Sequence, residues 1–330
     1  MNNRRKILVA LGAGALAVPL VSFAQQKNKT WRAGFLVAGP RPPAIDTHYI
    51  GAFVRGMREL GYVEGKNLVI EWRFAEGNYL RLPDLAAELV RMNVDVIVTG
   101  GGSANRALQQ ATSTIPIVNP TMSDPVGNGF AQSLAHPGGN ITGLALTTTD
   151  MSPKHIELAK LLLPKLTRLS ALVNLGNPAH AATFKSIEAN ALKLGVKTVR
   201  LDARNQEGIE RNFAVMKRDR AEAVIVAVDA FFLGQRQQIA ELALKQRLPS
   251  IFSALEHVEA GGLMSYGQSL TDLYRRGAAY VDKIFKGARP GDLPIEQPAV
   301  FSLAINRRTA KALGLAIPQE MLLRADKVIE

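Results

Sequence analysis

Apolar positions along the chain follow two spacings, one typical of buried strands and one typical of helices that cover a sheet. Both occur together near residue 100. An apolar run over 94–98 predicts a buried strand, and Gly100–Gly102 and Ser103 follow it. Over 104–111 the apolar residues recur at the i, i+3, i+4, i+7 spacing of a helix packed on a sheet. A second apolar run over 115–118 predicts the next parallel strand.

The glycine loop of this unit is a candidate binding loop. Ser103 stands where a helix N-cap is expected, and the free backbone N–H groups at such a helix start can receive an anion. In a parallel sheet, ligands lie beyond the carboxyl ends of the strands. The glycines also have a simpler explanation, a turn that needs positive φ, so the loop alone does not establish a site.

The same alternation of strand and helix continues over most of the chain. The predicted strands are 31–38, 68–74, 94–98, 115–118, 141–146, 170–175, 196–201, 223–228, 250–253, 263–266 and 301–305. The predicted helices are 47–60, 80–92, 104–111, 127–134, 153–163, 177–194, 207–217, 233–245, 270–285 and 307–313. Such alternation is typical of α/β proteins with doubly wound parallel sheets.

A polar run over 147–152 divides these units into two sets, which predicts two similar lobes. A chain of 330 residues also exceeds what one hydrophobic core usually supports. After the polar run, Ser152 is the expected N-cap of a helix with Pro153 at its first position. Ser269, with Asp272 three residues later, is the expected N-cap of the long helix over 270–285.

Residues 1–24 are typical of a secretory signal peptide. Three basic residues at 4–6 precede an apolar segment over 7–21, which is too short to span a bilayer. Small residues at the cleavage positions predict a cut after Ala24, and the adjacent arginines leave both the general secretory and the twin-arginine routes open. We therefore expect a periplasmic protein.

The chain contains no cysteine. This excludes disulfides, a thiol nucleophile, cysteine-ligated zinc and a lipid-modified cysteine, so we expect no direct membrane anchor and no lipoprotein. The net charge is +12, but the basic residues are scattered and adjacent only in pairs such as 275–276 and 307–308. Because a nucleic-acid surface needs clustered positive charge, we expect no nucleic-acid partner.

The patterns of common catalytic and metal sites are missing. Ser103 lacks the glycine two residues later that a nucleophile elbow requires, since Asn105 stands there. There is no P-loop, and the five histidines show no zinc-ligand spacing. We therefore expect neither an enzyme nor a bound metal or cofactor. An exported two-lobed α/β protein with polar residues at strand ends is typical of a binding protein that closes around its ligand by a hinge.

Several motifs resemble one family. They are GYVEGKNLVIEWRFAEG at 61–77, SDPV at 123–126, LAHPGGNITG at 134–143, LPIEQP at 293–298 and the tail 306–330. Together they resemble the periplasmic substrate-binding component of ABC transporters of the tryptophan/tyrosine-binding-like type. The resemblance implies a type I periplasmic-binding fold, two Rossmann-like lobes joined by three crossings, with a permease and an ATPase as partners.

The resemblance also implies how the chain divides. The N-terminal lobe is expected to span 31–146 and to include the helix 268–288. The C-terminal lobe is expected to span 147–267 and to include the tail 292–330. This division separates the long helix from its neighbours in the sequence.

Ligand-binding positions follow from the same resemblance. In amino-acid binders of this fold, hydroxyls and helix N-termini of the first lobe hold the carboxylate, and an acidic residue of the second lobe meets the ammonium. The matching positions are Gly100, Gly101, Ser103, Thr121, Ser123, Asp124, Asn177, Asp229 and Glu256. Ser103, Thr121 and Asp229 are the leading candidates.

Four of these positions also have a purely structural interpretation. Ser103 and Asp229 are both suited to cap a following helix, Asp124 with Pro125 is suited to turn the chain, and Glu256 is suited to a solvated surface. Phe231 or Tyr266 could stack on an aromatic ligand, although core packing is the favoured interpretation for both.

The sequence therefore predicts a periplasmic protein that captures a small solute for an ABC importer. An amino acid, an aromatic compound or a carboxylate would suit the predicted site. The alternative is a periplasmic sensor subunit that binds a solute and docks on a membrane receptor. A secreted hydrolase is disfavoured by the missing catalytic patterns.

Overall fold

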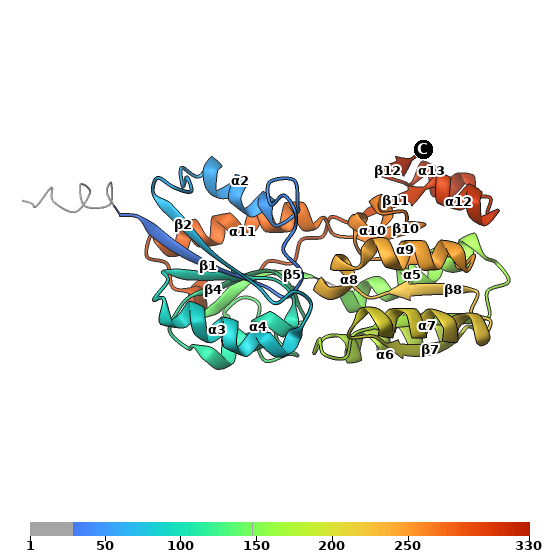
Figure 1. Ribbon diagram of the computed structural model, residues 1–330, viewed down its shortest axis with the longest axis horizontal. Coiled ribbons are helices and arrows are strands. Elements are labelled where there is room, and N and C mark those ends of the chain that lie inside the picture. Colours follow the sequence, from blue (N-terminus) through green and yellow to red (C-terminus); the bar gives the residue numbers. More distant parts are fainter. Residues whose placement is uncertain (1–28, 147) are drawn as a thin grey trace, which may run out of the picture.

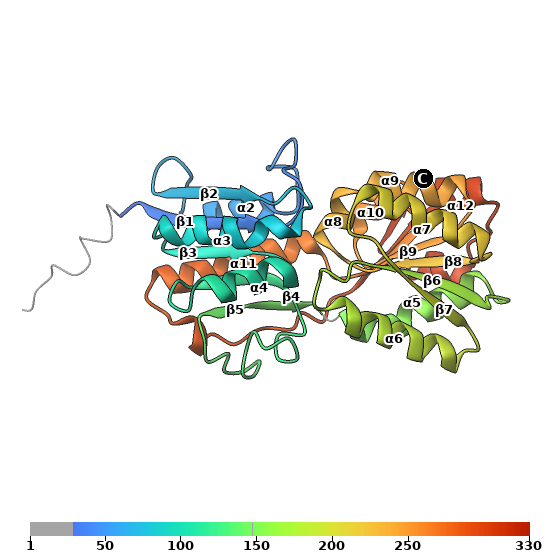
Figure 2. The same cartoon turned by 60° about the horizontal axis from the view of Figure 1, so that its bottom comes forward.

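The computed structural model describes residues 29–146 and 148–330, which form two lobes of strands and helices (Figures 1 and 2). The predicted signal peptide lies outside the described residues. Each lobe has one twisted sheet with helices on both faces, which is the α/β organisation that the alternating pattern predicts.

The first lobe contains a five-stranded parallel sheet in the order β2-β1-β3-β4-β5. Its strands are β1 (Trp31–Val37), β2 (Leu68–Phe74), β3 (Val96–Thr99), β4 (Ile117–Ser123) and β5 (Ile141–Leu146). Its helices are α2 (Gly51–Glu59), the 3-10 helix η2 (Tyr79–Arg81), α3 (Leu82–Arg91), α4 (Gly102–Ala111) and α11 (Leu270–Phe285). Buried residues of α2 and α11 share one apolar cluster, and those of α3 and α4 share another, so two helix layers cover opposite faces of the sheet (Figure 1).

The second lobe contains a seven-stranded sheet in the order β12-β11-β10-β9-β8-β6-β7, in which only the β10–β11 pair is antiparallel. Its strands are β6 (Arg168–Val173), β7 (Lys197–Asp202), β8 (Ala223–Val226), β9 (Ser250–Phe252), β10 (Met264–Gly267), β11 (Ser302–Asn306) and β12 (Lys327–Ile329). Its helices are α5 (Thr148–Leu162), α6 (His180–Lys193), α7 (Gln206–Arg218), α8 (Ala230–Gly234), α9 (Arg236–Lys245), α10 (Leu255–Glu259), α12 (Arg307–Leu313) and α13 (Gln319–Leu323). A short 3-10 helix, η3 (Pro290–Asp292), lies in the connection between α11 and β11.

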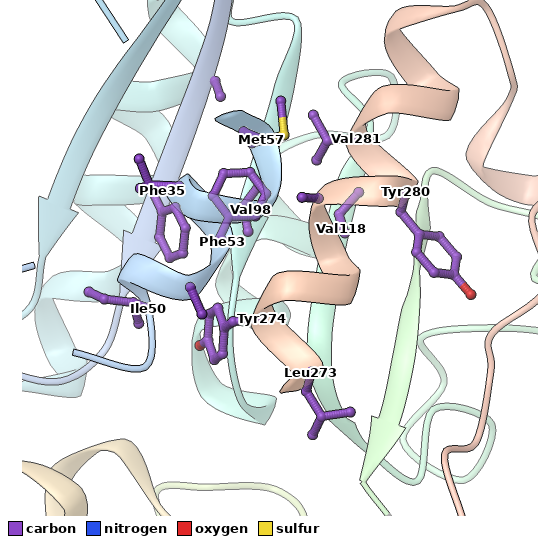
Figure 3. Close-up of a cluster of buried hydrophobic side chains, with 14 of the residues drawn as sticks. Phe35, Ile50, Phe53, Met57, Val98, Val118, Leu273, Tyr274, Tyr280 and Val281 are labelled. Carbon is purple, nitrogen blue, oxygen red and sulfur yellow. The ribbon is translucent and has the colours of Figure 1, made fainter. Parts of the chain in front are cut away.

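The chain passes between the two sheets three times, after β5, between β10 and α11, and before β11. The long helix α11 therefore packs in the first lobe although most residues before and after it belong to the second. Leu273, Tyr274 and Val281 of α11 belong to the same buried cluster as Phe53 and Met57 of α2 (Figure 3). The residue at which each lobe begins and ends stays a prediction.

The N-cap prediction for α11 is confirmed. The Ser269 hydroxyl accepts a hydrogen bond from the backbone N–H of Asp272 at 3.1 Å. Gly287 follows the helix with φ of +99°, a conformation that only glycine adopts easily.

Three helix predictions differ most from the structure in their limits or their existence. Residues 127–134 form a turn, bends and irregular chain in place of the predicted short helix. The helix expected to begin at Pro153 begins at Thr148, so Ser152 is not its cap and Pro153 lies inside it. The sequence favoured Pro153 as the first helical residue because proline fits the first turn of a helix. Inside a helix, proline removes a backbone hydrogen bond. Residues 46–50 form turns, and α2 begins only at Gly51.

We expect Ser269→Ala to lower the free energy of unfolding by about 1 kcal/mol, because one orphan N–H of α11 loses its acceptor. Chemical denaturation followed by circular dichroism measures this change. Ser113→Ala, at an exposed turn, is the matched control and should change stability by less than ~0.5 kcal/mol. Equal stabilities of the two variants would contradict the capping role.

Candidate functional site

A small cavity of about 50 Å³ lies between the two lobes. The first lobe contributes the ends of β1, β3, β4 and β5 with part of α11, and the second lobe contributes the segments after β6 and β8. Six predicted site residues line it: Gly100, Gly101, Thr121, Ser123, Asn177 and Asp229. The structure therefore brings most of the predicted set to one place, at the carboxyl ends of the strands.

The first-lobe wall is a glycine loop held from behind by β4. Gly101 has φ of +75° and is the N-cap residue of α4, and its N–H donates to Thr121 Oγ1 at 3.1 Å. The Gly101 carbonyl accepts from Nδ2 of the fully buried Asn119 at 3.0 Å. A Cβ on Gly100 would collide with the Tyr274 hydroxyl, so the close approach of the α11 phenol requires glycine there.

Ser103 is not the N-cap of α4, which corrects the sequence prediction. The positive φ of Gly101 starts the helix at Gly102, so Ser103 is already inside it. Its hydroxyl donates to the carbonyl of Gly176 in the second lobe at 3.0 Å. Ser103 does not line the cavity, and in this arrangement it connects the two lobes.

The second-lobe wall is centred on Asp229, whose side chain is fully buried. Its Oδ1 accepts from Tyr79 Oη at 2.7 Å, from Asn174 Nδ2 at 3.1 Å and from the N–H of Phe231 at 3.1 Å. Its Oδ2 accepts from Asn177 Nδ2 at 3.0 Å. Asp229 is thus both the N-cap of α8, as one interpretation of the sequence held, and a residue of the cavity wall.

Asp229 has no cationic partner among the described residues. His180 Nε2 lies 3.9 Å from Asp229 Oδ2. However, His180 Nδ1 accepts from the N–H of Asn174 at 2.9 Å, so the ring hydrogen is on Nε2, which donates to the carbonyl of Val228 at 3.0 Å. The imidazole is therefore neutral in this arrangement. Buried carboxylates are normally paired with a positive charge, whereas Asp229 is met by four neutral hydrogen-bond donors, so the cavity has a negative wall without a cation.

Aromatic and aliphatic side chains complete the cavity. The rings of Tyr49 and Tyr274 lie 5.3 Å apart at 51°, and both line it. Burial raises the pKa of both phenols, which therefore stay protonated. Leu233 and Leu270 add apolar surface from the two lobes. The site can therefore hold an apolar group next to charged ends.

Asp124 and Glu256 do not line this cavity. Asp124 is exposed with φ of +40°, and its Oδ1 accepts from the N–H of Gly127 at 2.9 Å, so it turns the chain as its structural interpretation held. Glu256 lies on α10, with a buried Oε2 that has no hydrogen-bond partner, and burial raises its pKa to about 6. Sequence reasoning assigned no helix to this segment, because five residues are too few for a helical period.

Phe231 and Tyr266 also lie outside the cavity. Phe231 belongs to a buried cluster of the second lobe, and Tyr266 stacks on Phe301 with centroids 5.7 Å apart. Packing against other side chains, the interpretation favoured from the sequence, therefore applies to both residues. Sequence reasoning missed Tyr49, Tyr79, Asn174 and Tyr274. Of these, only Asn174 directly follows a strand, β6, but the predicted strand over 170–175 included it and so hid its place at the strand end.

The lobes meet closely around α8, which lies at their boundary (Figures 1 and 2). A Cβ on Gly39 of the first lobe would lie 2.9 Å from the carbonyl oxygen of Ala230 in α8. A Cβ on Gly234 would lie 2.6 Å from the Pro40 ring. Glycine at these facing positions lets the two backbones approach, so the structure is a closed arrangement of the lobes.

Residues 29–146 and 148–330 contain neither a metal-binding cluster nor a membrane-spanning helix. No three His, Asp or Glu side chains there are grouped so that they could hold a metal ion. No helix within these ranges has the length and apolar composition needed to cross a bilayer.

Comparisons with known proteins agree on one family. The family model described as "ABC transporter substrate binding protein" matches residues 41–329. A tyrosine-binding protein of Clostridioides difficile is 24% identical over 96% of this chain and 94% of its own length. A crystal structure from Streptococcus pneumonia in complex with L-Trp is 25% identical with a TM-score of 0.83, covering 91% of this chain and 100% of that chain.

A conserved domain protein from Vibrio cholerae has a similar structure, with 28% identity and a TM-score of 0.84 over 91% of this chain and 100% of that chain. These similarities, with two sheets of mostly parallel strands flanked by helices, identify the fold as that of type I periplasmic binding proteins. The expected fold class is confirmed.

Tyr79→Phe should shift the lobes towards an open arrangement, because the hydroxyl that bonds Asp229 across the boundary is lost. A hydrogen bond to a charged group contributes ~1.5–3 kcal/mol, so the ratio of closed to open protein should fall about tenfold or more. Since the chain has no cysteine, spin labels can be attached through Lys66→Cys and Glu188→Cys, one in each lobe. Electron paramagnetic resonance then measures the distance distribution.

Tyr62→Phe is the matched control. Its hydroxyl donates to Asp282 at 2.9 Å, so the same kind of bond is removed, but both residues belong to the first lobe. We expect this variant to leave the distance distribution unchanged. Identical distributions for the two variants would show that the Tyr79 bond does not hold the lobes together.

Proposed function

Because this chain belongs to the ABC transporter substrate-binding protein family, we propose that it captures a small solute between its lobes and delivers it to a permease and its ATPase. The cavity between two lobes that are joined by three crossings supports this role, since such lobes close around a ligand by a hinge. The signal-peptide pattern over 1–24 supports a location in the periplasm. The role is binding without catalysis.

We infer that the solute is an amino acid, and the observation that carries this is the unpaired buried carboxylate of Asp229. An α-ammonium group would supply the missing positive charge at Oδ2, the oxygen that accepts only from Asn177 within the described chain. Oδ1 already accepts three hydrogen bonds. Oδ2 would therefore be the atom of Asp229 that accepts from the ammonium group of the ligand, and this bond would orient the head group.

The opposite wall suits the carboxylate of the same head group. Helix α4 has ten residues, and its N-terminus begins directly after the loop of Gly100 and Gly101 that lines the cavity. Free N–H groups and the positive end of a helix attract anions. The Thr121 hydroxyl lies on the same wall, next to Gly101. A zwitterionic head would thus be placed between complementary charges from the two lobes.

The side chain of the solute is expected to be large and apolar or aromatic. The two phenol rings of Tyr49 and Tyr274, with Leu233 and Leu270, provide flat and apolar walls. The relatives support the same class, since one is named a tyrosine-binding protein and another was crystallised with L-Trp.

Entry of such a solute requires the lobes to separate. The cavity of about 50 Å³ is far smaller than the ~300 Å³ at which ligand pockets typically begin. The interlobe bonds of Tyr79 and Ser103 would break on opening and form again on closure. Opening therefore exposes the binding walls, and closure buries the ligand.

Aromatic ligands should stabilise the protein strongly against heat only when they carry both the carboxylate and the ammonium of an amino acid. L-Tryptophan, L-tyrosine and L-phenylalanine at ~100 times their dissociation constants should each add ~2.7 kcal/mol of stability. Tryptamine, which lacks the carboxylate, and indole-3-propionate, which lacks the ammonium, should give much smaller shifts. Thermal-shift measurements compare the series, and equal shifts for all indole compounds would contradict the head-group assignment.

Asp229→Asn should weaken amino-acid binding by about tenfold or more, since the variant keeps the side-chain shape but loses the charge that meets the ammonium. Isothermal titration calorimetry measures the affinity. Asp202→Asn is the control, because Asp202 also ends a strand of the second lobe but lies outside the cavity. Unchanged affinity in Asp229→Asn, with the unliganded melting temperature retained, would refute the amino-acid assignment.

A further inference from the structure

A groove of about 410 Å³ continues from the cavity along the boundary between the lobes. It lies between the loop that follows β1 and the helices α8 and α9. Four residues line both spaces: Val37, Tyr49, Ala230 and Leu233. A second interlobe groove, lined by Tyr79 and Arg204, shares no residue with the cavity. A ligand too large for the cavity would therefore extend past Tyr49 and Leu233 into this first groove.

Arg236 presents an unpaired positive charge to this groove. It is the first residue of α9, is half-buried, and its Nη1 donates to the carbonyl of Leu233 at 2.8 Å. This bond fixes the guanidinium and leaves its other N–H groups available. No carboxylate in the described ranges lies within 4 Å of Arg236, since it takes part in none of their ion pairs.

His48 adds a second hydrogen-bond donor. The N–H of Ile50 lies 3.5 Å from His48 Nδ1, a contact that favours the tautomer with the ring hydrogen on Nε2. Burial and the nearby charge of Arg236 lower the pKa of His48 to about 4, which keeps the imidazole neutral at ordinary pH. Arg41 lines the same groove from the first lobe.

The groove has no compensating acid in its walls. None of the residues that line it is an aspartate or a glutamate. The charge of Arg236 does act on Glu256, where it opposes the rise in pKa that burial causes. However, Glu256 lies on α10 and lines neither the groove nor the cavity. The groove therefore offers donors and positive charge to whatever enters it.

Aromatic rings line the path from the cavity to these donors. The Tyr274 and Tyr49 centroids are 5.3 Å apart, and the Tyr49 and His48 centroids are 4.1 Å apart. An aromatic side chain held by its head group in the cavity could lie along these rings. Its far end would then point towards Arg236 and His48.

We propose that this groove is the side-chain subsite of the cleft, and that Arg236 with His48 selects amino acids whose distal end is negatively charged or accepts hydrogen bonds. The inference rests on the proposed amino-acid function and adds a specificity to it. A guanidinium that is held in place and lacks a carboxylate partner gains most from such a group, because charge-assisted hydrogen bonds are stronger than neutral ones.

Three ligands with the same head and ring test the subsite: L-phenylalanine, L-tyrosine and 4-carboxy-L-phenylalanine. Calorimetry should give the tightest binding for the carboxylated compound, about tenfold or more tighter than phenylalanine, with tyrosine between them. Arg236→Gln should reduce this preference to about threefold or less while phenylalanine binding changes little. Arg236→Lys keeps the charge and should retain most of the preference.

Arg204→Gln is the matched control, since it removes the same charge from the groove that does not adjoin the cavity. It should leave the order and the size of the preferences unchanged. An equal loss for all three ligands in Arg236→Gln would mean that the residue acts only on structure, and a wild-type preference for phenylalanine would also overturn the subsite. If the wild type binds neither these three ligands nor L-tryptophan, the amino-acid function itself is wrong and the subsite fails with it. If it binds L-tryptophan but none of the three, only the subsite is overturned.

Discussion

The buried carboxylate of Asp229 is the group on which the interlobe region depends. One of its oxygens accepts hydrogen bonds from Tyr79 of the first lobe and from Asn174 of the second, so a single atom links the lobes. The neutral His180 beside it contributes no charge in this arrangement. Because a charge removed from water needs compensation, Asp229 both stabilises the closed arrangement and defines the proposed position for a cationic ligand group.

Close approach of the two backbones sets the shape of the space around that carboxylate. Gly39 lets the Ala230 carbonyl of α8 approach the first lobe, Gly234 leaves room for the Pro40 ring, and Gly100 leaves room for the Tyr274 hydroxyl. The resulting cavity is small, and its extension runs along Tyr49 towards the groove of Arg236. The packing that closes the lobes thereby favours one direction for the side chain of a bound amino acid.

Local patterns predicted the regular elements well. The strand over 68–74 and the helix over 307–313 match the structure, because apolar spacing and the residues at their ends are local signals. The short helices α8 and α10 escaped prediction as separate elements, since five residues show no helical period. The N-cap prediction for Ser103 was wrong for a related reason. The start of α4 depends on the positive φ of Gly101, a conformation that glycine allows but does not require.

The sequence by itself determined the α/β class, the family and most positions at the strand ends that line the cavity, because parallel strands bring their carboxyl ends to one edge. Only the tertiary structure decided which of those side chains face one another. Asp124 turns away and Glu256 lies on a separate helix, whereas Tyr79 and Tyr274 reach the site from elements that no local pattern connects with it. Such contacts join residues far apart in the chain, so packing alone sets them.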